Sequence, residues 1–348
     1  MQKNGDNRPA TFIFGAMAAE KIIAEWKKQQ FKPVYWLEGE EDYYIDVVMD
    51  YAEHRILNES EAGFNLTVFY GKDADWTAVV NACRRYPMFA EKQVVLLKEA
   101  QQMRDIDKLE AYIENPLTST IFVVSYKEKT LDGRTSLSKL LKKTAQVFTS
   151  KKIYDSKLPE WTNELVTSRG YNIAQKALML LVEHIGNDLS RIANEVDKLL
   201  LNLGSEKLIT EDDIEKYVGV SKEYNVFELQ DALGKKDLSK AMKIIRYFEG
   251  NPKAAPIQMV LPALYNSFSK AYMLFALQGK DDKTMAAAMG ISPFFIKDYQ
   301  AIARNYSFSG VEQALLLLHE YNLKSVGVGS IGTPDASLLK EMAVKMML

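Results

Sequence analysis

The chain has 348 residues, enough for two or three domains with buried cores. Its 44 Lys and Arg nearly balance 46 Asp and Glu, and a net charge of −2 excludes a broad electrostatic sleeve around nucleic acid, though not a local basic patch. The single cysteine, Cys83, excludes an internal disulfide framework. No apolar run approaches the ~20 residues of a membrane span, and the apolar segment Thr11–Ala18 is short for a signal peptide, so we expect a cytoplasmic protein.

Five short strand candidates alternate with helical patterns over residues 1–150. Several strands are apolar throughout and rich in Val, Phe and Tyr, which is typical of strands buried on both faces of a parallel sheet. The alternation predicts right-handed crossovers and a three-layer α/β domain of the nucleotide-binding type. The predicted strands are Val34–Leu37, Asn65–Tyr70, Gln93–Lys98, Thr120–Tyr126 and Gln146–Thr149. The predicted helices between them are Tyr43–Leu57, Asp75–Arg85, Asp105–Glu114 and Ser136–Lys143.

The turn after the first strand is the place where such a fold binds a phosphate. A P-loop there reads G-x-x-x-x-G-K-[ST], and its backbone amides and lysine neutralise the phosphates. This chain instead has Glu38, Gly39, Glu40, Glu41 and Asp42, with no lysine. A nucleotide triphosphate would meet like charge, so we predict a degenerate P-loop turn that binds no nucleotide. Helix capping explains the acids equally well, because negative charge at a helix N-terminus is favourable.

The loop before the third strand is a candidate binding element. Pro87 ends the preceding helix and the strand begins only at Gln93, so Met88 and Phe89 lie in a loop flanked by charges. One interpretation is that these two side chains anchor the loop in the core. The alternative is an exposed apolar plug for a partner's pocket, the usual anatomy of a binding hot spot.

After Ser150 we expect no further strand, and the pattern is helical to the end of the chain. An apolar stripe from Leu178 to Leu203 predicts consecutive helices over residues 151–221, a small helical domain. A linker predicted at Gly219–Asn225 leads to a second helical domain over residues 222–348. Its clearest predicted helices are Asp237–Phe248, Ala255–Gln278, Pro293–Arg304, Gly310–Lys324 and Asp335–Met346.

The sequence contains no recognisable catalytic motif. There is no nucleophile elbow and no Rossmann glycine triplet, and the histidines are not spaced as metal ligands, so we expect no catalytic residue, no metal and no other cofactor. The histidines are His54, His184 and His319. Lys139, Lys142 and Lys143 fall on one side of a predicted helix. That side is either a solvated face or a stripe that contacts phosphates.

Together these segments resemble the delta subunit of the bacterial DNA polymerase III clamp loader over nearly the whole chain. The order and spacing of the segments carry the resemblance, because none of them is a catalytic motif. They are Pro33–Glu41, Tyr86–Val95, Leu131–Thr135, Ile185–Leu189, Glu195–Leu199 and Phe227–Gly234.

The resemblance implies an α/β plus all-α fold: an AAA+-like domain without a working P-loop, a helical lid (151–221) and a helical collar (222–348). It implies that Tyr86, Pro87, Met88 and Phe89 bind the sliding clamp. The pair Met88–Phe89 would insert into a pocket on the clamp and favour the open ring, although Pro87-Met88 departs from the more usual leucine- or glutamine-bearing versions.

The partners implied by the resemblance are the sliding clamp, the other loader subunits through the C-terminal domain, and primed DNA as part of the complex. No membrane partner is expected. Two other functions stay open from the residues themselves. One is an active ATPase on the same fold, and the other is a nucleic-acid-binding regulator without clamp contact.

Overall fold

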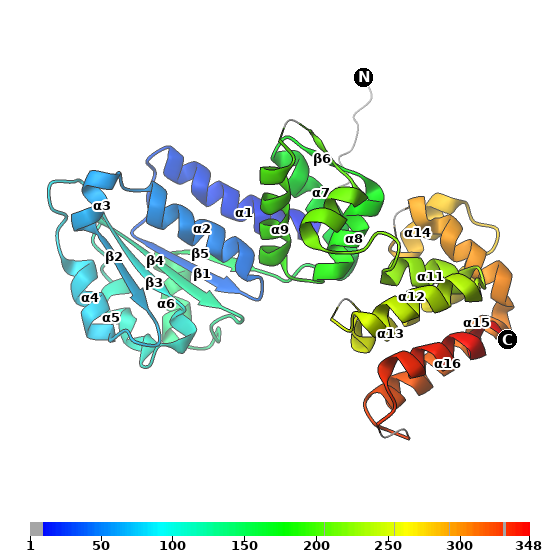
Figure 1. Ribbon diagram of the computed structural model, residues 1–348. Helices are drawn as coiled ribbons and strands as arrows, with labels where there is room; N and C mark the ends of the chain where they lie inside the picture. The colour runs from blue at the N-terminus through cyan, green and yellow to red at the C-terminus, as the bar shows by residue number, and fades with distance from the viewer. Residues whose placement is uncertain (1–9, 205, 254, 292, 330–331) are drawn as a thin grey trace. The chain divides into compact units, whose positions relative to one another are not determined.

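The computed structural model describes residues 10–204, 206–253, 255–291, 293–329 and 332–348 (Figure 1). The chain divides into two compact units, one ending at Lys157 and one comprising Leu158–Leu348. A further division near residue 221 stays a prediction. Within the described ranges, no helix combines the length and the apolar character that crossing a membrane requires.

The first unit is built on a five-stranded parallel sheet with the strand order β2-β3-β4-β1-β5. Helices α1 and α2 lie on one side of this sheet, and α4, α5 and α6 lie on the other (Figure 1). The strands are β1 Val34–Gly39, β2 Leu66–Tyr70, β3 Gln93–Lys98, β4 Thr120–Lys127 and β5 Gln146–Ser150. The helices are α1 Ala10–Lys27, α2 Asp42–Arg55, α3 Glu59–Asn65, α4 Trp76–Arg84, α5 Glu110–Ile113 and α6 Ser136–Thr144.

Strand β1 is buried on both faces, which explains its apolar sequence. Val34 and Trp36 belong to the cluster shared with α4, α5 and α6, whereas Tyr35 points to the opposite face. There Tyr35 meets Trp26 of α1 edge to face, with ring centroids 4.9 Å apart. This two-sided burial confirms the expectation of strands enclosed between helical layers.

All five predicted strands of this sheet are confirmed, with ends that differ by at most two residues. The helix α3 was not predicted. It begins with a capping box, in which Asn58 accepts from the Glu61 amide and the Glu61 carboxylate accepts from the Asn58 amide. The predicted helix Asp105–Glu114 divides into a 3₁₀ segment, η2 Ile106–Leu109, and the short α5.

The described residues of the second unit are helical, apart from one short strand pair. Its helices are α7 Leu158–Ser168, α8 Gln175–Ile185, α9 Leu189–Asn202, α10 Glu211–Asp213, α11 Val226–Gly234, α12 Leu238–Gly250, α13 Ile257–Leu274, α14 Asp282–Met289, α15 Ile296–Ser325 and α16 Asp335–Met347. The prediction that no strand follows Ser150 is wrong, because β6 Asn172–Ile173 pairs in parallel with β7 Leu208–Ile209. Two-residue strands are too short to show any periodicity in a sequence.

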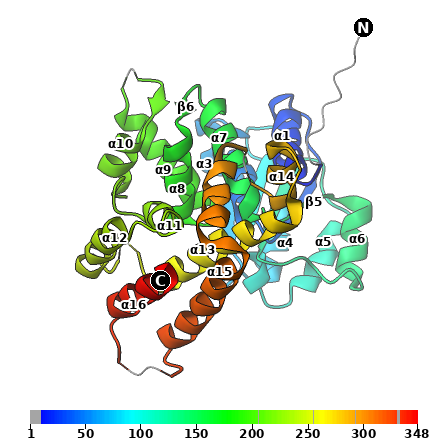
Figure 2. The ribbon, with the colours of Figure 1, turned by 90° about the vertical axis from the view of Figure 1, so that its right-hand side faces the viewer.

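The core of the C-terminal helices forms around α13 and α15, which lie side by side (Figure 2). Phe268 of α13 meets Tyr306 of α15 edge to face, and the Tyr306 hydroxyl donates to the Leu233 carbonyl at 2.7 Å. The two predicted helices Pro293–Arg304 and Gly310–Lys324 form the single element α15, interrupted at Ser307, whose φ is +59°. The break therefore lies where the sequence analysis separated the two helices.

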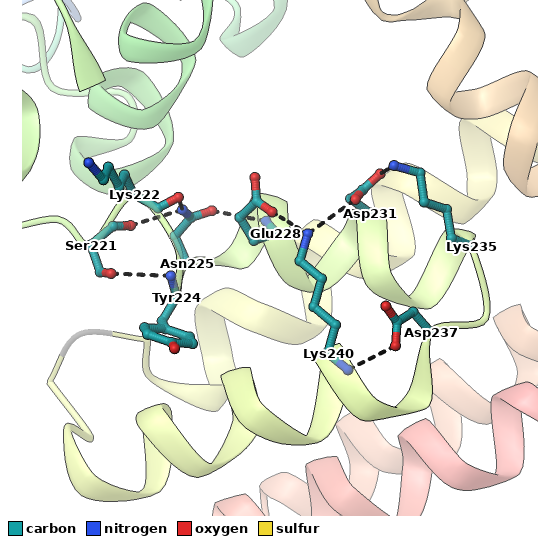
Figure 3. Close-up of polar contacts among 9 residues, drawn as sticks. All are labelled: Ser221, Lys222, Tyr224, Asn225, Glu228, Asp231, Lys235, Asp237 and Lys240. Carbon is teal, nitrogen blue, oxygen red and sulfur yellow. Dashed lines mark hydrogen bonds and ion pairs between the residues drawn. The ribbon is translucent and has the colours of Figure 1, made fainter. Parts of the chain in front are cut away.

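The predicted linker is held against the start of α11 by Asn225, which is buried (Figure 3). Its side-chain oxygen accepts from the Glu228 amide at 3.0 Å, and its side-chain nitrogen donates to the carbonyls of Ser221 and Lys222. On the next helix, Lys240 pairs with both Glu228 and Asp231. The segment before α11 is thus an ordered connection.

Candidate functional site

Three backbone amides at the carboxyl end of β1, where a P-loop would offer amides to a phosphate, donate to groups of the protein instead. The Gly39 amide donates to the Lys129 carbonyl at 3.2 Å, and the Glu40 amide donates to the Ser150 carbonyl at 3.2 Å. The Tyr43 amide donates to the Glu41 carboxylate at 3.3 Å. A phosphate at this turn would have to displace hydrogen bonds within the protein.

The acids of this turn have structural partners. One oxygen of Glu38 accepts from the Trp36 indole at 3.0 Å and from the Leu131 amide at 3.1 Å. Glu41 is buried and caps α2. Burial raises the pKa of Asp42 above its ordinary value, while Lys127 opposes this rise. The capping interpretation therefore accounts for Glu41, and Glu38 fastens the turn to the loop that follows β4.

Lys127, at the end of β4, forms ion pairs with two acidic side chains. Its ammonium lies 2.7 Å from an Asp46 oxygen and 3.0 Å from a Glu99 oxygen. Burial opposes its charge, but these two carboxylates raise the pKa of Lys127 above the usual value. This lysine is neutralised by the chain itself, which makes it a poor counter-charge for a nucleotide.

The loop between α4 and β3 presents its apolar side chains to solvent. Tyr86 is 76% exposed, Met88 53% and Phe89 94%, whereas Pro87 is partly buried. These exposures rule out the interpretation in which Met88 and Phe89 anchor the loop in the core of this chain. This loop precedes β3, whereas the turn Glu38–Asp42 follows β1. Because β1 and β3 run parallel, the loop lies at the amino ends of the strands and the turn at their carboxyl ends.

Two buried side-chain amides hold this loop, and the sequence analysis assigned no role to either. Asn65, 3% exposed, accepts from the Met88 amide at 2.7 Å and donates to the Met88 carbonyl at 2.9 Å. Gln93, 5% exposed, donates to the Arg85 carbonyl and to the Thr120 hydroxyl. In the sequence, each of them is the polar first residue of a predicted strand that is mostly apolar.

The lysines singled out on the sequence lie on α6. Lys139, Lys142 and Lys143 are all exposed, and their helix packs beside β5. Tyr86, Pro87, Met88 and Phe89 thus belong to one loop, whereas the three lysines belong to α6.

Two family models match the chain. Residues 35–151 match the model described as DNA polymerase III, delta subunit, and residues 223–329 match the model of its C-terminal domain. The chain belongs to the DNA polymerase III delta subunit family. The resemblance inferred from the order and spacing of its segments is therefore confirmed, and the family places the chain in DNA replication.

Relatives and a solved structure agree with this assignment. The DNA polymerase III subunit delta of Bacillus subtilis is 26% identical over 92% of this chain and 94% of its own length. A probable delta subunit of Aquifex aeolicus is also 26% identical, over 80% of this chain and 83% of its own length. The solved structure of the Bacillus subtilis DNA clamp loader delta protein superimposes with a TM-score of 0.52 at 24% identity. It covers 94% of this chain and 99% of that chain.

The structural match bears on the fold. The α/β plus all-α class predicted from the sequence, an AAA+-like parallel-sheet unit followed by helices, is confirmed. The match covers the chain from the sheet into the C-terminal helices.

Proposed function

We propose that this clamp-loader delta subunit binds the sliding clamp through Tyr86, Pro87, Met88 and Phe89 and favours the open ring for loading onto primed DNA. The observation that carries the proposal is the 94% exposure of Phe89 at the tip of a loop held by buried hydrogen bonds. The conformation of the loop keeps this aromatic side chain exposed to water, and its burial by a partner would lower the free energy of the complex.

The proposed opening of the clamp follows from differential affinity. A ligand shifts a conformational equilibrium only as far as it binds one state better than the other. If the pocket for Met88 and Phe89 is better formed in the open clamp, insertion of the two side chains favours that state. The delta subunit then needs no chemistry of its own to act on the clamp.

The same proposal assigns no ATP hydrolysis to this chain. In support, the Gly39 and Glu40 amides of the turn donate to carbonyls of the protein, and Lys127 is paired with carboxylates. An active ATPase on this fold would need both a cradle of free amides and a positive side chain. Motor subunits elsewhere in the loader would supply the hydrolysis.

We further propose that residues 222–348 join the other loader subunits. In support, α13 carries exposed Met259, Tyr265 and Met273 on its surface, and Lys270 is the one charged residue within this 18-residue helix. An exposed helix surface with so little charge is typical of a protein interface. Primed DNA would be a partner of the assembled complex.

The test is the double substitution Met88→Ala and Phe89→Ala in the full chain. Loss of two hot-spot side chains is expected to cost on the order of 2–4 kcal/mol, or roughly 30- to 1000-fold in clamp affinity. Thermal stability should stay near wild type because both side chains are exposed. Tyr154→Ala, which removes another exposed aromatic ring of the same unit, is the matched control.

Surface plasmon resonance with immobilised clamp measures both variants. Wild-type affinity in the double variant would overturn the clamp-binding proposal and favour the nucleic-acid-binding regulator. Equal losses in the double variant and in Tyr154→Ala would show that the loop has no special role.

A further inference from the structure

We propose that Asn65 is a positioning residue that sets the clamp-binding loop in its binding conformation before the clamp arrives. This inference rests on the proposed function of Met88 and Phe89 and adds a residue that does not itself reach the partner. Asn65 is the last residue of α3 and is separated from Met88 by 23 positions in the sequence.

The fold brings these two residues together through the pairing of β2 with β3. Leu66 at the start of β2 lies opposite Val94 near the start of β3. The residue before β2 and the loop before β3 therefore meet at one edge of the sheet. Asn65 is buried at that edge, and its side chain has the Met88 backbone within hydrogen-bond distance.

The Asn65 side chain satisfies both backbone groups of Met88. Its Oδ1 accepts from the Met88 amide at 2.7 Å, and its Nδ2 donates to the Met88 carbonyl at 2.9 Å. The same Nδ2 also donates to the Glu61 carbonyl at 3.1 Å, which fixes the amide against its own helix. A carboxamide offers a donor and an acceptor side by side, so it pairs with one residue as a neighbouring strand would.

The residue after Met88 shows what the two Asn65–Met88 hydrogen bonds hold in place. Phe89 has a φ of +56°, in the left-handed region, which is unfavourable for a residue with a side chain. Such a conformation persists where the surrounding structure determines it. Because Met88 is tied at both its amide and its carbonyl, the direction in which the chain enters Phe89 is determined, and the ring projects into solvent.

A loop that is already ordered loses less conformational entropy on binding than a loop that must be ordered by its partner. Removal of the Asn65 side-chain amide should therefore weaken clamp binding although the binding side chains are unchanged. We expect Asn65→Ala to lower clamp affinity by about tenfold. In the free chain, hydrogen exchange of the Met88 amide should become faster, because that amide loses its acceptor.

Asn65→Asp separates positioning from folding. The carboxylate keeps an acceptor for the Met88 amide but removes the donor to the Met88 and Glu61 carbonyls. A carboxylate oxygen then faces these two carbonyl oxygens, so we expect a loss of affinity at least as large as in Asn65→Ala. The variant is nearly isosteric and leaves no cavity, so it gives a second measurement of the role of this side chain, and wild-type affinity would overturn that role.

Asn58→Ala is the matched control for destabilisation of α3. Asn58 caps this helix by accepting from the Glu61 amide and has no hydrogen bond to the loop. Its loss should lower thermal stability and leave clamp affinity within about twofold of wild type. An affinity loss in Asn58→Ala as large as that in Asn65→Ala would overturn the positioning role.

The two proposals fail in different ways. Wild-type clamp affinity in Asn65→Ala, together with faster Met88 exchange, would overturn the role of Asn65 while the clamp-binding proposal stands. Wild-type affinity in the Met88→Ala, Phe89→Ala variant would overturn the proposed function, and any effect of Asn65 would then have another cause. The positioning role is supported when both loop variants lose affinity and Asn58→Ala does not.

Discussion

The backbones of Gly39 and Ser150 lie directly against each other at the carboxyl edge of the sheet. A Cβ atom at position 39 would lie 2.0 Å from the Ser150 carbonyl oxygen, and Gly39 has a φ of +137°. Both facts require glycine at this position. The single glycine of the degenerate turn therefore lets the turn lie against Ser150, the last residue of β5.

Gly39→Ala should destabilise the first unit by about 2 kcal/mol or more, because it introduces a backbone clash and an unfavourable φ together. Gly63→Ala is the control. It lies within α3, has open space around it, and should be neutral or stabilising by roughly 0.5–1 kcal/mol. Thermal unfolding of both variants measures the difference. Equal melting temperatures would contradict the close approach of the two backbones.

The purified chain should neither bind nor hydrolyse ATP appreciably, since the Gly39 and Glu40 amides are bonded within the protein and the turn has no lysine. Isothermal titration calorimetry with ATP and Mg²⁺ provides the measurement. Micromolar affinity that disappears on substitution of Glu40 or Glu41 would show that the turn binds nucleotide after all.

Stability should depend on pH through Glu183 of α8. Burial raises the pKa of Glu183 to about 8, although the positive charge of Lys270 lowers it. Unfolded glutamic acid titrates near 4.3. Between these values the folded chain binds more protons than the unfolded chain, so this residue reduces stability as the pH rises through the window.

Glu183→Gln replaces the carboxyl group with an amide that does not ionise, so it should remove this loss of stability. Its stability relative to wild type is expected to rise by roughly 1–3 kcal/mol between about pH 5 and about pH 8.5. Thermal unfolding across this range measures it, with the exposed Glu206→Gln as control. A difference from wild type that does not change with pH would contradict the raised pKa.

Assembly with the other loader subunits should depend on the exposed side of α13. Met259→Lys with Met273→Lys adds two charges to a surface that carries little charge, and we expect at least a tenfold loss of binding to those subunits. Clamp affinity should be unchanged. Leu201→Lys, on the exposed side of α9, is the control. Size-exclusion chromatography with the partner subunits measures assembly, and undiminished co-elution would count against this interface.

The sequence by itself determined the five parallel strands and the place of the loop proposed to bind the clamp. Strand Gln93–Lys98, for example, is apolar at its four central positions because both of its faces are buried, and such a run can be recognised within the strand's own sequence. Pro87 predicts the end of a helix because its ring leaves no backbone N–H to donate, and α4 ends before it, at Arg84. The acidic turn after β1 could also be recognised from the sequence, because the residue types themselves give its charge.

Only the tertiary structure decided how those segments are held. Asn65 reads as the first residue of a strand, yet it is the end of α3 and the partner of Met88. Gly39 reads as the remnant of a P-loop, yet it makes room for Ser150. The physical reason is the same in both cases. A hydrogen bond or a close approach between residues far apart in the sequence depends on strand order and register, which no local pattern of residues records.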